Sequence, residues 1–108
     1  MSNVIEITDN EFEKAVFTAD KPVLAYFWAA WCGPCRLVSP SISGIADLYS
    51  DRLTVVKLEV DPNPNAVAAA QVKGVPALRL YSNNELLASY EGAIGQQQLQ
   101  TWLENHLP

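Results

Sequence analysis

One apolar segment, residues 23–29, restricts the folds that this chain can adopt more than any other part of the sequence does. Its seven residues, Val-Leu-Ala-Tyr-Phe-Trp-Ala, are all apolar or aromatic, so neither face of an extended strand would present charged groups to water. A strand of this kind lies in the middle of a sheet and is covered by helices on both faces. The segment therefore predicts a layered α/β architecture.

The rest of the chain alternates between strand-like and helix-like patterns. Thr8 and Glu11 form a capping-box signature, Pro40 predicts a helix kink, and Asn84 in a hairpin turn tolerates a positive φ. The predicted strands are residues 4–7, 23–29, 53–60, 77–81 and 86–90, and the predicted helices are 8–18, 32–48, 66–72 and the segment after Gly95. The order β-α-β-α-β-α-β-β-α predicts a central mixed five-stranded sheet flanked by four helices.

Composition excludes several classes of function. The chain has 108 residues, 49% of them hydrophobic, which predicts one packed domain over residues 1–108. The net charge is −5 and the seven basic residues are scattered, so we expect no nucleic-acid partner. The most apolar run, residues 23–31, falls short of the roughly 20 residues that a spanning helix needs, so we expect no membrane partner. Residues 1–6 show no signal peptide, and we expect a cytoplasmic monomer.

Both cysteines of the chain lie in one tetrapeptide, as Cys32 and Cys35. A disulfide that staples a small domain closes a long loop, and this pair closes almost none, which disfavours a purely structural bond. A zinc site would need two further ligands, and the chain offers only His106, which we interpret as a solvent-exposed residue of the last helical turn. We therefore expect a redox pair with no metal ion and no cofactor.

The position of the pair suits thiol–disulfide exchange. Cys32 falls near the N-cap of a predicted helix, where free backbone N–H groups and the helix dipole stabilise a thiolate. Cys35 lies one turn further along, within reach of Cys32. Gly33 keeps bulk away from the first sulfur, and Pro34 suits a first helical turn because it needs no hydrogen-bond donor. In the expected mechanism Cys32 attacks a substrate disulfide, and Cys35 then resolves the mixed disulfide.

The pentapeptide Trp31-Cys32-Gly33-Pro34-Cys35, directly after the apolar strand, resembles the active site of the thioredoxin family. The similarity runs the length of the chain and includes Asp61-Pro62-Asn63-Pro64, Gly74-Val75-Pro76 and Gly92 before the last helix. The resemblance implies the thioredoxin fold, reductase activity on disulfide-containing target proteins, and electrons from a thioredoxin reductase. It also implies a cis Val75–Pro76 bond beside the disulfide, at an X–Pro position where cis bonds occur.

Partners of the family dock on a flat apolar surface around the first cysteine. By position, this docking surface comprises Trp31, Gly33, Pro34, Val60, Gly74, Val75, Pro76, Gly92 and Ala93. The backbone of Val75 is expected to pair with the substrate chain as a strand would. We assign Trp28 to the core beneath the site and Trp102 to the core face of the last helix.

The sequence departs from the family at Tyr26, where a typical thioredoxin has a buried Asp. In the family this Asp helps to deprotonate the resolving cysteine, which a neutral phenol with a pKa of about 10 would do poorly at neutral pH. Lys57 matches the lysine that pairs with the Asp, and here it lacks that partner. Either Tyr26 simply fills the core, or resolution by Cys35 is slowed, its pH optimum is raised and the set of partners is narrower.

Three functions remain open at this level. The first is a protein-disulfide reductase. The second is a binding module that uses the docking surface as a scaffold, and a double Cys32→Ser, Cys35→Ser variant separates the two because a scaffold would keep its function. The third, a net oxidant or isomerase, is disfavoured because we expect a cytoplasmic protein and because Gly33-Pro34 resembles the reductase type.

Overall fold

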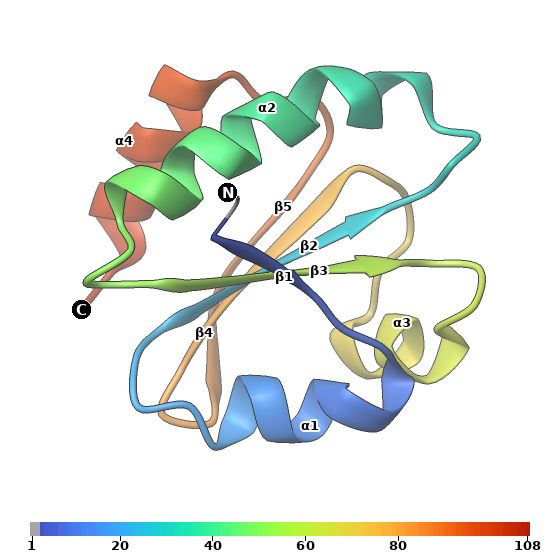
Figure 1. Cartoon of the computed structure of the whole chain (residues 1–108), viewed down its shortest axis with the longest axis horizontal. Helices are drawn as coiled ribbons and strands as arrows, with labels where there is room; N and C mark the ends of the chain where they lie inside the picture. Colours follow the sequence, from blue (N-terminus) through green and yellow to red (C-terminus); the bar gives the residue numbers. More distant parts are fainter. Residues whose placement is uncertain (1–2) are drawn as a thin grey trace.

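A computed structural model describes residues 3–108, and it shows a central sheet between two layers of helices (Figure 1). Met1 and Ser2, which belong to the segment considered for a signal peptide, lie outside the described residues. The strands are β1 (Val4–Glu6), β2 (Val23–Trp28), β3 (Thr54–Glu59), β4 (Ala77–Ser82) and β5 (Glu85–Glu91). The helices are α1 (Asp9–Phe17), α2 (Gly33–Leu48), α3 (Pro64–Ala70) and α4 (Gln96–His106).

The sheet is mixed, as predicted, and its strand order is β1-β3-β2-β4-β5. Strands β1 and β2 run parallel to β3, whereas β4 runs antiparallel to β2 and β5 antiparallel to β4. Strand β2 is therefore the middle strand. Helices α2 and α4 cover one face of the sheet, and α1 and α3 cover the other (Figure 1).

The middle strand confirms that the apolar segment is buried on both faces. Leu24 and Tyr26 point into the core under α2 and α4, where they meet buried side chains such as Ile42 and Leu99. Residues 23, 25 and 27 point into the second core, under α1 and α3. Because successive side chains of a strand alternate between faces, this one segment contributes to both cores.

Short sequence patterns predicted several features of the elements correctly. Thr8 caps α1, and its backbone N–H donates to Oε1 of Glu11 at 3.0 Å, as the capping-box signature predicts. Asn83 and Asn84 form the hairpin turn with φ values of 52° and 67°, so the expected positive φ at Asn84 is confirmed. Pro40 lies inside α2, and the kink expected there stays a prediction.

Trp102 is half-buried and packs against the core under α2 and α4, as expected, and its ring lies 6.4 Å from that of Tyr90 between centroids. The expected limits of α3 need correction at both ends. Helix α3 begins at Pro64 rather than at residue 66, because proline fits the first helical position. The α3 helix also ends two residues early, at Ala70, because Gln71 takes the left-handed conformation with φ 55°.

The N-terminus of α3 is capped by a residue from α1. The carboxylate of Asp9 accepts hydrogen bonds from the backbone N–H groups of Asn65, at 3.1 Å, and Ala66, at 2.8 Å. These are two of the N–H groups that a helix leaves without an internal partner. Asp9 therefore orients the helix that leads into the loop before Pro76.

We expect Asp9→Ala to lower the free energy of unfolding by about 1 kcal/mol, because it removes the acceptor for both N–H groups. Urea denaturation followed by circular dichroism measures the change. Asp51→Ala, in an exposed turn, is the matched control and should change stability by less than about 0.5 kcal/mol. Equal effects of the two substitutions would contradict the cap.

Candidate active site

The two cysteines lie where β2 has ended and α2 begins. Cys32 is the N-cap residue of α2, and Pro34 lies in the first turn, as predicted. The pair forms a disulfide with its Cα atoms 5.3 Å apart. The backbone N–H of Cys35 donates to Sγ of Cys32 at 3.1 Å. After reduction, the same N–H is placed to stabilise a thiolate on Cys32.

Both cysteines are buried in this oxidised form. Cys32 is 5% exposed and Cys35 is 2% exposed, so the first cysteine is the slightly more accessible of the two. The pair is covered by a small apolar cluster made of Trp28, Ala29, Val60 and Val75. Gly33 and Pro34, between the cysteines, are exposed, and a Cβ at Gly33 would meet no atom within 4 Å. The open side of the pair is therefore the Gly33 side.

Trp31 borders the site as an exposed side chain. Its side chain is 68% exposed, and its indole Nε1 donates to Oδ2 of Asp61 at 2.8 Å. The indole lines a small apolar pocket of about 150 Å³ together with Val60, Val67, Val72, Lys73, Gly74 and Val75. Sequence reasoning noted the Asp61-Pro62 motif but did not connect it with Trp31. Asp61 fixes the indole at the edge of the docking surface.

Two loops complete the predicted docking surface. The Val75–Pro76 bond is cis, which confirms the expectation drawn from the resemblance. The carbonyl oxygen of Pro76 accepts from the N–H of Gly92 at 2.9 Å, and Gly92 has a φ of 123° that only glycine adopts without strain. Ala93, next in the chain, is exposed. Within residues 3–108 the backbone N–H and C=O of Val75 have no hydrogen-bond partner.

Tyr26 lies beneath Cys35. It is 1% exposed, and its hydroxyl donates to the carbonyl oxygen of Cys35 at 3.1 Å and lies 3.2 Å from Oγ of Ser39. Burial raises the pKa of the Tyr26 phenol above its ordinary value, with the Ser39 hydrogen bond opposing the change only in part. Tyr26 is therefore protonated at neutral pH and cannot accept a proton from Cys35. Ser39, which donates to the same carbonyl at 2.9 Å, is a neighbour that sequence reasoning missed.

Lys57 lies opposite Tyr26 in the register between β2 and β3. It is half-buried, and its ammonium nitrogen lies 5.8 Å from the centroid of the Trp28 ring, within cation–π range. In the part of the chain that the structure describes, Lys57 forms no ion pair. The Tyr–Lys arrangement thus replaces the carboxylate–lysine pair expected of a typical family member.

A family model for thioredoxin matches residues 3–105. The chain belongs to the thioredoxin family. It is 57% identical to a thioredoxin-like protein of Synechocystis sp. over 105 residues, which cover 97% of this chain and 96% of that protein. It is 40% identical to a thioredoxin of Acidithiobacillus ferridurans over 104 residues, 96% of each chain. It is 36% identical to thioredoxin 1 of Nostoc sp. over 107 residues, 99% of this chain and all of that one.

Family membership and the Cys32–Cys35 disulfide together assign thiol–disulfide redox chemistry to this site. Among residues 3–108, no cluster of three or more His, Cys, Asp or Glu side chains could hold a metal ion. No helix in the same range is long and apolar enough to cross a membrane.

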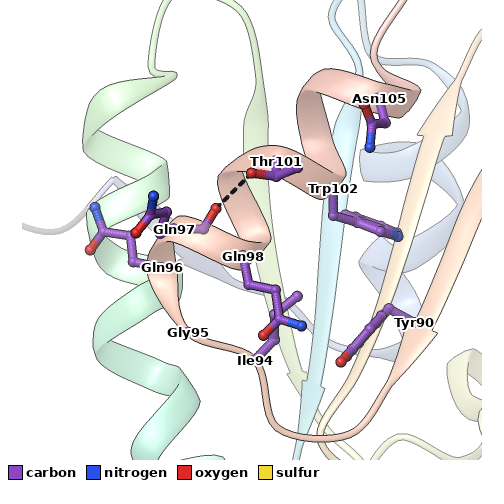
Figure 2. Close-up of a pocket in the computed structure, with 9 residues that line it drawn as sticks. All are labelled: Tyr90, Ile94, Gly95, Gln96, Gln97, Gln98, Thr101, Trp102 and Asn105. Carbon is purple, nitrogen blue, oxygen red and sulfur yellow. Dashed lines mark hydrogen bonds between the residues drawn. The ribbon is translucent and has the colours of Figure 1, made fainter.

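A larger cavity, of about 710 Å³, lies away from the cysteines, between β5 and α4 (Figure 2). The Tyr90 and Trp102 side chains face it, and Gln98 and Asn105 contribute amides. Neither cysteine lines this cavity or the small pocket beside Trp31.

Proposed function

We propose that this chain is a protein-disulfide reductase. The Cys32 thiolate attacks a disulfide of the target protein and forms a mixed disulfide, releasing one target sulfur as a thiolate. Cys35 loses its proton and attacks Sγ of Cys32, which releases the second target sulfur and leaves the Cys32–Cys35 disulfide. Two electrons pass from the dithiol to the target, and a thioredoxin reductase then restores the dithiol. We expect this cycle to run in a cytoplasmic monomer.

The observation that carries the proposal is the disulfide at the N-terminus of α2, beside a surface with free backbone groups. The N–H of Cys35, 3.1 Å from Sγ of Cys32, is placed to donate to a thiolate there, and the N-terminus of α2 favours the same negative charge. The unpaired N–H and C=O of Val75 offer an extended polypeptide the hydrogen bonds of a neighbouring strand. A small disulfide could not use these groups, which favours a protein as the substrate.

The surroundings of Tyr26 support the proposal that Cys35 resolves the mixed disulfide slowly. A buried carboxylate below Cys35 could take its proton, whereas the Tyr26 hydroxyl donates to the Cys35 carbonyl and stays protonated. Cys35 must then lose its proton to solvent. We therefore propose that resolution is rate-limiting near neutral pH and that this protein acts on fewer partners than a typical member of the family.

Reduction of insulin disulfides with dithiothreitol as electron source tests both proposals. Rates are followed from about pH 6 to about pH 9 and corrected for the uncatalysed reaction at each pH. We expect catalysis that rises with pH across this range, by up to about tenfold per pH unit, because only the thiolate of the resolving cysteine attacks. A pH–rate profile that is flat near neutral pH would indicate that Tyr26 only fills the core and does not slow resolution. No catalysis at any pH would favour the scaffold function, in which the Cys32→Ser, Cys35→Ser variant keeps its partners.

A further inference from the structure

One buried charge has no part in the cysteine chemistry. Arg79, in the middle of β4, is 3% exposed, and among residues 3–108 the other buried polar side chain is Asn63. Its strand neighbours Leu78 and Leu80 are buried and apolar. A charge is costly in such surroundings unless its donors are satisfied, so the contacts of Arg79 explain why it can lie there.

The guanidinium contacts the end of α3 and the loop after it. Nε donates to the carbonyl oxygen of Ala70 at 2.8 Å, and Nη2 donates to that of Gln71 at 3.0 Å. Nη1 donates to the carbonyl oxygen of Leu78 at 2.9 Å. Carbonyl groups at the end of a helix have no internal partner, and Arg79 supplies one. The loop of residues 71–76 is therefore fixed to β4 where it starts.

Glu91, the last residue of β5, completes the arrangement. Its Oε2 accepts from Nη2 of Arg79 at 2.6 Å and from the backbone N–H of Lys73 at 3.3 Å. The Arg79 hydrogen bond holds the pKa of Glu91 below its ordinary value, although burial acts in the opposite direction. Glu91 directly precedes Gly92, whose N–H donates to the Pro76 carbonyl. The ion pair thus joins the two loops of the docking surface, residues 74–76 and 92–93.

Arg79 is buried and Glu91 is partly exposed, with side-chain exposures of 4% and 34%. A charge buried in this way is seldom the most stable way to fill a site, because apolar residues of similar volume are often as stable. What this pair supplies is a fixed geometry for the loop around Val75. We propose that Arg79 and Glu91 are positioning residues that set how tightly a protein substrate binds, because they hold the Val75 backbone in place for strand-like pairing. This inference rests on the proposed reductase function. It assigns the preference of the protein for protein disulfides to the pair Arg79 and Glu91.

The test compares two substrates in Glu91→Gln and in the unmodified protein. Insulin offers a peptide backbone to Val75, whereas dithiobis-nitrobenzoate is a small disulfide that offers none. We expect the insulin KM to rise about tenfold with kcat nearly unchanged, because ground-state and transition-state binding are lost equally. The rate at which the reduced variant reacts with the small disulfide should stay within about twofold of the unmodified rate.

Two further variants complete the comparison. Glu104→Gln is the matched control, because it removes the same charge from an exposed ion pair with Arg52 at 3.4 Å, and it should change neither substrate's kinetics. Glu91→Asp keeps the charge on a shorter side chain. If Glu91→Gln does not fold, Glu91→Asp replaces it in the test, and the insulin KM of this variant should rise. An unchanged insulin KM in a folded Glu91 variant, or an equal loss towards both disulfides, overturns the inference.

Amide hydrogen exchange separates this inference from the proposed function. The Lys73 N–H is bonded to Glu91, so its exchange should quicken about tenfold in Glu91→Gln and remain unchanged in Glu104→Gln. An unchanged Lys73 rate in Glu91→Gln overturns the inference whatever the kinetics. If the unmodified protein does not reduce insulin, the reductase proposal fails, and the Lys73 rate still decides whether the pair holds the loop.

Discussion

When the pre-reduced protein is mixed with insulin in the absence of dithiothreitol, replacing Cys35 by Ser is expected to stop the release of reduced insulin and to leave the protein covalently attached to its target. Cys32 keeps its place at the N-terminus of α2 and can still form the mixed disulfide. The resolving thiol is gone, and a serine hydroxyl does not displace a thiolate. The attached complex should appear on a non-reducing gel and should disappear when dithiothreitol is added.

Cys32→Ser is the matched control for this experiment. It should show neither turnover nor the attached complex, because the remaining Cys35 is the inner and more buried of the two residues. A complex formed by Cys32→Ser and not by Cys35→Ser would reverse the assignment of the attacking and resolving cysteines. Complexes formed equally by both variants would contradict a preferred first attack by Cys32.

The second large effect is expected for Tyr26→Asp. The substitution removes a large, fully buried ring and should lower the free energy of unfolding by about 3–5 kcal/mol. It also puts a carboxyl group near Cys35 and in register with Lys57. A carboxylate at this place can accept the Cys35 proton, so resolution at neutral pH should quicken about tenfold or more.

The pH–rate profile of insulin reduction, measured well below the melting temperature of each variant, checks this expectation. The profile of Tyr26→Asp should be flatter near neutral pH than that of the unmodified protein. Tyr26→Phe is the control, because it keeps the ring and removes only the hydroxyl that donates to Cys35, and its profile should not change. If all three proteins share one pH–rate profile, the lack of a proton acceptor near Cys35 does not limit the rate of insulin reduction by this protein.

The elements that sequence analysis placed best depend on neighbours a few residues apart. The apolar run in β2 marks burial on both faces, and the Asn83-Asn84 pair marks a turn that needs positive φ. The position of Cys32 as an N-cap follows from the short distance to Pro34 and the helical pattern after it. The resemblance to the thioredoxin family then supplied the docking surface and the cis bond before Pro76, which no local pattern shows.

The contacts that sequence analysis missed join residues far apart in the chain. Asp9 caps a helix that begins 55 residues later, at Pro64, and Asp61 holds the indole of Trp31 across 30 residues. The Asp9 cap supports the early start of α3, because it satisfies the N–H groups of Asn65 and Ala66. The sequence around a carboxylate does not indicate which distant N–H group will donate a hydrogen bond to it.

Sequence by itself determined the order of elements and the place of the redox pair, because hydrophobic periodicity and helix-end chemistry act over a few residues. It also showed that Tyr26 and Lys57 could not form a carboxylate–ammonium pair. Only the tertiary structure decided where the Tyr26 hydroxyl points and what neutralises Arg79, since both answers depend on which segments the strand order brings together. Sequence analysis did not single out Arg79, and it is the pairing of β4 with β5 that brings Glu91 to the guanidinium.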